Sequence, residues 1–175
     1  MTATPAAAAA PLPPVPEADA GRPLQDLLKV HCYGCGALNE RGLQIKSCWE
    51  GDTLVCRWTP KPHHIGPPGH VYGGLIASVV DCHAIWAAIG RQCREAGIAL
   101  ADGPPPFVYV TGRLTVNYLK PTPIDGPMVV SARVVEHGAR KSLVHCEVRH
   151  GDLLCATAEV IAVRVARAGA TTEPA

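Results

Sequence analysis

The 175-residue chain has little of what marks several common classes of protein. Charged residues make up only 18% of it, and 16 Lys and Arg residues nearly balance 15 Asp and Glu residues, for a net charge of +1. A nucleic-acid-binding domain usually carries a basic excess or a basic stripe, and the sequence has neither. It also has no internal repeat. We therefore expect a small molecule or another protein as the partner, and no nucleic acid.

A secretion signal is also absent from the N-terminal residues. Residues 1–20 contain no Lys or Arg and no Leu-rich run, so they resemble neither a signal peptide nor an Arg-rich transit peptide. We expect a cytoplasmic protein whose eight cysteines are reduced. The Ala- and Pro-rich composition predicts a disordered tail over residues 1–21. A single domain is expected over residues 22–168, followed by a disordered C-terminus at 169–175.

Apolar periodicity and turn residues predict an α+β chain. Residues 73–97 are expected to form one long helix of roughly 37 Å. Turn-forming residues separate short runs of apolar or alternating residues, which are expected to be antiparallel strands. The predicted elements are a short helix at about 23–30, strands at 43–49 and 53–58, the long helix, and strands at 107–119, 128–136, 142–149 and 153–165.

The first two-thirds of the long helix is apolar nearly all the way round. A helix of that kind is buried, either in a protein core or in a membrane. Asp81 and His83 in its middle argue against a membrane span. The charged segment Arg91–Glu95 is expected to reach solvent. Such a helix needs a curved antiparallel sheet of about six strands to cover it.

Three segments carry a resemblance to a known family. They are Cys32-Tyr33-Gly34-Cys35-Gly36 with Asn39 and Gly42-Leu43, the loop Gly66–Gly74 followed by Val79-Val80-Asp81, and the strand Thr111–Pro121 (TGRLTVNYLKP). Over about residues 31–165 the chain resembles the hotdog-fold thioesterase superfamily, in particular acyl-CoA thioesterases of the phenylacetate-pathway type. The resemblance implies a hotdog fold, a helix wrapped by a curved sheet. It also implies a homodimer or homotetramer with active sites at the subunit interface.

The sequence departs from the family pattern at Tyr72. The family most often has His-Gly-Gly here, and this chain has Tyr72-Gly73-Gly74. A phenol can still donate a hydrogen bond, so Tyr72 is kept as a candidate catalytic residue.

Asp81 is the central catalytic candidate. A carboxylate within an apolar helix is costly to bury without a partner, so its presence indicates either a function or a dedicated partner. As a general base it would activate water, and as a nucleophile it would attack the thioester directly. The structural alternative is a buried Asp satisfied by a hydroxyl or an Arg.

Gly73 and Gly74 begin the long helix and are candidates for an oxyanion hole. The first N–H groups of a helix have no partner within it, and the helix dipole favours negative charge there. Asp81 lies seven to eight residues further on, roughly 10–12 Å along the axis. One helix therefore cannot bring both groups to one carbonyl, which predicts that the two come from different subunits. The alternative is an ordinary helix start.

Thr111 aligns with a Ser or Thr that accompanies the catalytic acid in related thioesterases, and it is expected to position the attacking water. The alternative is an ordinary strand residue. For substrate binding we single out Gly66 and His70 in the loop before the helix, and Arg140 and Lys141 at a turn, where they would contact the coenzyme A phosphates. His63 and His64 either line an acyl channel or are exposed.

The pair Cys32-x-x-Cys35 suggests zinc, but structural zinc needs four ligands and no second Cys-x-x-Cys occurs. We therefore expect neither a metal nor a cofactor. The predicted reaction is hydrolysis of an acyl-CoA, or of an acyl carrier protein thioester, to the free acid. Two alternatives stay open: a hotdog dehydratase or hydratase, and a non-catalytic acyl-CoA-binding module. The few aromatic residues do not define the acyl group.

Overall fold

The computed structural model describes residues 11–166, and its elements follow the predicted order. The helices are η1 (Glu17–Asp19), α1 (Leu24–Leu27), η2 (Pro62–His64), α2 (Gly73–Ala96) and η3 (Leu100–Asp102). The strands are β1 (Ser47–Glu50), β2 (Thr53–Trp58), β3 (Phe107–Tyr118), β4 (Met128–His137), β5 (Lys141–His150) and β6 (Leu153–Ala166). Residues 169–175, where a disordered C-terminus is predicted, lie outside the described part.

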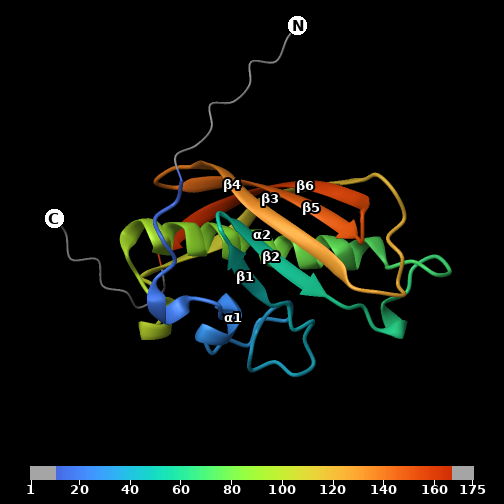
Figure 1. Cartoon of the computed structure of the whole chain (residues 1–175), viewed down its shortest axis with the longest axis horizontal. Helices are drawn as coiled ribbons and strands as arrows, with labels where there is room; N and C mark the ends of the chain where they lie inside the picture. The colour runs from blue at the N-terminus through green and yellow to red at the C-terminus, as the bar shows by residue number, and fades with distance from the viewer. Residues whose placement is uncertain (1–10, 167–175) are drawn as a thin grey trace, which may run out of the picture.

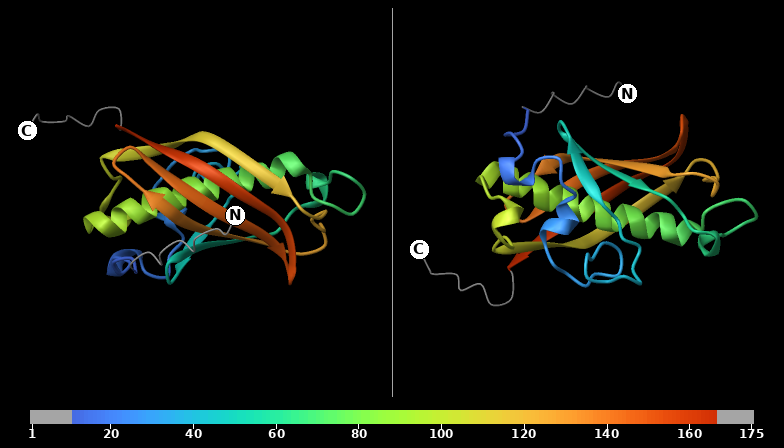
Figure 2. Two further views of the ribbon diagram at one scale, coloured as in Figure 1. Left: turned by 90° about the horizontal axis from the view of Figure 1, so that it is seen from above. Right: turned by 60° about the horizontal axis from the view of Figure 1, so that its bottom comes forward.

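The six strands form one antiparallel sheet in the order β1-β2-β4-β5-β6-β3. Helix α2 lies along one face of this curved sheet, with the strands crossing it diagonally (Figures 1 and 2). Side chains alternate between the faces: Val144, Cys146 and Val148 of β5 are buried, whereas the intervening His145 and Glu147 are exposed. The α+β architecture of one central helix against a six-stranded sheet is the hotdog fold that the sequence predicts.

A β-bulge at Gly112 changes which side chains of β3 face the helix. The pairing with β6 shifts between Thr111 and Arg113. Before the shift, Phe107 and Tyr109 are buried and Thr111 contacts α2; after it, Leu114 and Val116 pack on the core. The extra residue inverts the alternation of side chains, so residues of opposite parity face the helix before and after Gly112. The bulge thus points Thr111 at the helix.

The predicted strand at 43–49 begins only at Ser47. Gln44 has φ +53°, a left-handed conformation that interrupts an extended chain. Leu43 and Ile45 are nevertheless buried, and their N–H groups donate to the carbonyls of Tyr33 and Gly34. Residues 43–46 are therefore fixed by pairing with the Cys32–Gly36 segment rather than by the sheet.

The packed part of the chain starts earlier than residue 22, the predicted domain boundary. Asp19 is buried and accepts hydrogen bonds from the N–H groups of Leu100 and Ala101 at 2.8 and 2.9 Å. The Leu12 N–H donates to Asp52. Residues 1–10 of the predicted tail lie outside the described part.

Arg94 is buried, although the sequence placed it in a solvent-exposed segment. Its guanidinium donates to the carbonyls of Pro13 and Gly51 and pairs with Asp52, and it stacks over the Trp49 ring. The N-terminal segment and the turn between β1 and β2 together supply the acceptors that make this burial tolerable. Local charge indicated exposure, but a segment distant in sequence covers the site.

Helix α2 is long and apolar enough to cross a bilayer by length and composition alone, with a mean hydropathy of 1.4 over its most apolar window. In the described part of the chain it is the one helix with this property. Its buried side chains include Val79, Val80, Ala84 and Ala87, which belong to the core. Core packing accounts for its apolar composition.

Candidate active site

Asp81 and Thr111 meet where α2 passes the edge strand β3. The Thr111 hydroxyl donates a hydrogen bond to a carboxylate oxygen of Asp81. Asp81 is half-buried and Thr111 is exposed, so the carboxylate is open on one side instead of sealed in the core as the sequence suggested. A carboxylate held by one hydroxyl and still accessible can accept a proton from water or attack a carbonyl.

His83, two residues beyond Asp81, faces the opposite side of the helix and is fully buried. Its Nδ1 lies 2.8 Å from Ser47 Oγ, and its Nε2 lies 3.1 Å from the Leu54 carbonyl oxygen. Because a carbonyl only accepts, Nε2 carries the proton and Nδ1 accepts from the hydroxyl. Gln25 completes the network by bonding both Ser47 Oγ and Ser47 N–H. Burial lowers the pKa of His83 to about 4, so it is neutral and structural.

The N-terminus of α2 is built from Tyr72, Gly73 and Gly74. Tyr72 is the N-cap residue without a side-chain cap, and the residue is 59% exposed. A Cβ on Gly74 would lie 2.6 Å from the Tyr72 ring, so a glycine lets the phenol fold back over the helix end. The Tyr118 hydroxyl donates to the Gly73 carbonyl at 2.7 Å. The Leu75 N–H donates to the Tyr72 carbonyl at 3.0 Å, whereas the N–H groups of Gly73 and Gly74 have no acceptor among the described residues, as an oxyanion hole requires.

The two halves of the predicted site lie apart within one chain. Gly73 and Asp81 belong to one continuous helix, which separates them by roughly 12 Å along its axis. Groups that act on one carbonyl converge within about 3 Å of the reacting atoms. A single protomer therefore holds the carboxylate and the helix N-terminus in separate places.

Gly66 and His70 lie in the loop that leads into α2. The Gly66 N–H donates to the His70 carbonyl, and His70 Nδ1 is bonded to the Pro68 carbonyl at 2.9 Å. His70 and Gly73 line a hollow of about 320 Å³, together with Ile76, Tyr118 and Lys120. The structure thus brings His70 to the helix N-terminus, whereas Gly66 shapes the loop.

Arg140 and Lys141 are not brought to the carboxylate of their own chain. Both are exposed. Lys141 pairs with Val163 at the start of β5, and its side chain points away from α2, since the next residue, Ser142, is the buried one. Lys141 lines a separate hollow on the outer face of the sheet with Arg113 and Leu143. The predicted substrate contacts of these two residues gain no support within one protomer.

A larger, cationic cavity is lined by Tyr72, the residue before Gly73. Its volume is about 520 Å³, and it is bordered by Tyr33, Tyr72 and Leu75. Its basic lining residues are Arg41, Arg57, Lys61, His63 and His64. Sequence patterns did not indicate the two arginines and the lysine, because only the fold brings Arg41 together with the segment that carries Arg57 and Lys61. His64 stacks on Trp58, and burial lowers its pKa.

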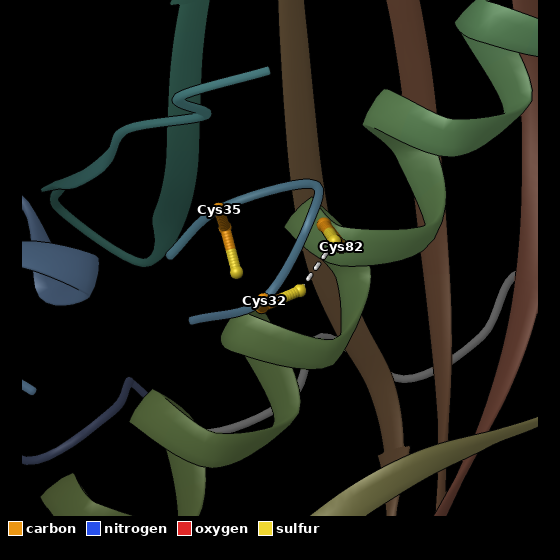
Figure 3. Close-up of side chains that lie close together, drawn as sticks. All are labelled: Cys32, Cys35 and Cys82. Carbon is orange, nitrogen blue, oxygen red and sulfur yellow. Dashed lines mark hydrogen bonds between the residues drawn. The ribbon is translucent and has the colours of Figure 1, made fainter. Parts of the chain in front are cut away.

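One further cluster brings together the thiols of Cys32, Cys35 and Cys82, whose sulfurs lie within 4.8 Å of one another (Figure 3). The pKa of Cys35 is lowered to about 6, first by the hydrogen bond from the Cys82 thiol and then by the Trp86 N–H, against the effect of burial. The Cys82 thiol correspondingly has a raised pKa. Sequence spacing gave no signal for Cys82, which is 47 residues from Cys35.

A long central helix packed against a six-stranded antiparallel sheet defines a hotdog protein. Residues 68–156 match the family model described as Thioesterase superfamily, and the chain belongs to this family. A thioesterase superfamily protein from Shewanella loihica PV-4 is 34% identical; the match covers 77% of this chain and 93% of that one, with a TM-score of 0.56.

Two further proteins are similar to the chain. The acyl-coenzyme A thioesterase THEM4 of Xenopus laevis is 29% identical over 99 residues, 57% of this chain and 38% of that protein. The chain thus spans less than two-fifths of this curated relative. A phenylacetic acid degradation-related protein from Ralstonia eutropha shares the fold, with 20% identity, 69% of this chain and 85% of that one covered, and a TM-score of 0.56.

Proposed function

We propose that this protein is an acyl-CoA thioesterase that hydrolyses an acyl thioester to the free acid and coenzyme A. The observation that carries the proposal is the hydrogen-bonded pair Asp81–Thr111 on a helix that begins with two glycines. The N–H groups of Gly73 and Gly74 stabilise the oxyanion, and Asp81, oriented by Thr111, activates water. Direct attack by Asp81 to give an anhydride is the variant of this mechanism. A carrier-protein thioester is the alternative substrate.

The proposed active enzyme is a homodimer, or a homotetramer made of two such dimers. In each dimer, Gly73 of one subunit faces Asp81 of the other. The edge strand β3 supports this arrangement. It is the last strand of the sheet, 12 residues long, and no described strand pairs with its outer edge. Val110, Tyr118 and Leu119 on or beside it are about half exposed. A long edge of this kind favours pairing with a second copy.

Coenzyme A is proposed to lie with its phosphates in the cationic cavity beside Tyr72, because that cavity gathers arginine, lysine and histidine side chains. The thioester then reaches the neighbouring hollow that contains Gly73. Tyr72, which lines the cationic cavity next to Gly73, would donate a hydrogen bond from its phenol O–H. The family usually has a histidine at this position. A cytoplasmic location with reduced thiols completes the proposal.

The first test measures thiol release from a panel of acyl-CoAs by wild type and Gly73→Pro, with enzyme-only blanks for the protein's own cysteines. Proline is tolerated at the first helical position but lacks the N–H donor. Tyr72 has ψ 127°, which suits a following proline. We expect a fall in kcat of about 10²-fold or more, as for removal of one oxyanion donor. Gly73→Ala, which keeps the donor, is the matched control.

A mixing experiment tests the shared site. Asp81→Asn and Gly73→Pro subunits, unfolded together and refolded, form mixed dimers with one intact site if the two groups act across the interface. Random pairing then restores about a quarter of wild-type activity. If activity stays at the level of the separate variants although mixed dimers form, each site is built within one chain and the interface proposal is wrong.

A non-catalytic acyl-CoA-binding protein is the second candidate, favoured by the single substitution of Tyr72 for the motif histidine. It predicts saturable binding of acyl-CoA to wild type without release of thiol from any member of the panel. That result would replace the hydrolase proposal.

A further inference from the structure

Three cysteines from two distant segments converge beside helix α2. Cys32 and Cys35 lie in the loop between α1 and β1, and Cys82 projects from the helix toward them (Figure 3). The sulfurs of Cys32 and Cys82 are 3.9 Å apart. Cys32 is exposed, Cys82 is half-buried and Cys35 is buried, so the cluster has one side open to solvent.

The surroundings of the cluster suit thiolates. The Trp86 indole N–H donates to Cys35 Sγ at 3.1 Å, and the charge of Lys46 also favours the anionic form of Cys35. A Cβ on Gly34 would lie 2.3 Å from Cys82 Sγ, so only glycine between the two loop cysteines lets the third sulfur approach. Indole donors and a nearby cation stabilise metal-bound thiolates in the same way.

We propose that Cys32, Cys35 and Cys82 form a site for a thiophilic cation of the Zn²⁺ type, with its fourth position open on the Cys32 side to water or an external ligand. Zinc–sulfur bonds of about 2.3 Å in a tetrahedron place neighbouring sulfurs about 3.8 Å apart. The Cys32–Cys82 separation already matches this value. Binding replaces the thiol protons with three sulfur–metal bonds and releases those protons to solvent.

The expectation of no metal came from counting two thiolates, and the fold supplies the third. A disulfide is a poorer fit to the same geometry. It would join only two of the three sulfurs and leave the third thiol without a role. A single bound cation, in contrast, would be coordinated by all three sulfurs.

A bound cation would tie the Cys32–Gly36 loop to α2 at the residue next to Asp81. The same loop contributes Tyr33 to the wall of the cationic cavity. Leu43 and Gln44 also border this cavity. The N–H groups of Leu43 and Ile45 bind this segment to the loop through the carbonyls of Tyr33 and Gly34. A bound cation would therefore fix the position of the cavity wall relative to the helix.

The test is a Co²⁺ titration of reduced, chelator-stripped full-length protein without oxygen, followed by Zn²⁺ competition. We expect one Co²⁺ per chain, a thiolate-to-cobalt charge-transfer band in the near ultraviolet, displacement by Zn²⁺, and an apparent Zn²⁺ Kd below about 1 µM. Cys82→Ser and Gly34→Ala weaken binding by about 100-fold or more. Cys48→Ser, a half-buried cysteine outside the cluster, leaves it unchanged.

Folding of the variants is checked by circular dichroism and by melting with and without Zn²⁺. At a concentration about 100-fold above Kd, Zn²⁺ raises the wild-type Tm by about 5–10 °C and leaves that of Cys82→Ser unmoved. The proposal is overturned if reduced wild type shows no thiolate band, or if Cys82→Ser retains it. A Cys32–Cys82 disulfide, mapped in air-exposed protein that binds no metal when reduced, would also overturn it and identify a redox pair.

Discussion

Asp81 and His83 are two residues apart on α2, yet the two faces of the helix that carry them are built differently. His83 lies under β1 and β2 at 0% exposure, with both ring nitrogens bonded. Asp81 faces the edge strand β3, half-buried, with the Thr111 hydroxyl bonded to one of its oxygens. A polar group that is sealed and satisfied stabilises the fold, whereas one that is held but left accessible is able to do chemistry.

The largest expected effect tests the open face. Asp81→Asn keeps the shape and can still accept from Thr111, but it removes the base, so kcat/KM of thioester hydrolysis falls by about 10²-fold or more. The free energy of unfolding changes by no more than about 0.5 kcal/mol. Thiol release measures kcat/KM, and urea denaturation measures the free energy of unfolding. Asp152→Asn, on an exposed turn, is the matched control, and activity in Asp81→Asn equal to that of the control would remove Asp81 from the mechanism.

The sealed face should respond in the opposite way. His83→Ala removes the acceptor of the Ser47 hydroxyl proton and the donor to the Leu54 carbonyl, and it opens a cavity. The change costs about 3 kcal/mol of unfolding free energy. Activity per folded molecule stays near wild type. Denaturation at fixed protein concentration measures the loss, and His145→Ala, an exposed pair with Glu159, should change stability by less than about 0.5 kcal/mol. A loss of activity larger than the loss of folded protein would contradict this division.

Acid should weaken the fold through the same histidine. Its pKa is about 4 when folded and about 6.5 when unfolded, because burial penalises the charged form. The unfolded state therefore binds the proton first. Full stability is present above pH 6.5 and is lost as the pH falls toward 4, with a slope approaching 1.4 kcal/mol per pH unit. Urea midpoints across this window measure the slope, which His145→Ala should retain and His83→Ala should reduce. The remaining slope comes from His64 and His137, because burial lowers their pKa values too.

The sequence predicted the elements well because they depend on local patterns. The apolar composition of α2 and the turns between strands gave a helix and six strands whose ends mostly agree within one or two residues. Strand order does not follow from such patterns, since any strand can pair with several others. The left-handed Gln44 and the burial of Arg94 also escaped, because segments distant in sequence impose both.

In the candidate site, too, the residues of local motifs were predictable and those brought together by the fold were not. Gly73, Gly74 and Asp81 lie within one local motif, and the contact of Thr111 with Asp81 followed from family resemblance rather than from spacing. Arg41, Arg57 and Lys61 of the cationic cavity, and Cys82 of the thiol cluster, belong to no local motif. Only the three-dimensional arrangement reveals groups of this kind.

The smallest expected effect sharpens the description of the open face. Thr111→Val removes the donor to Asp81 at nearly constant volume, and the loss of one hydrogen bond to a charged group should lower kcat/KM by about 10-fold. Thr111→Ser restores the hydroxyl and most of the activity. If the role is to orient the carboxylate, kcat changes and KM stays within about twofold, because the alcohol contacts the base rather than the substrate. A Val variant as active as wild type would mean that the bulge at Gly112 turns Thr111 toward the helix for packing alone.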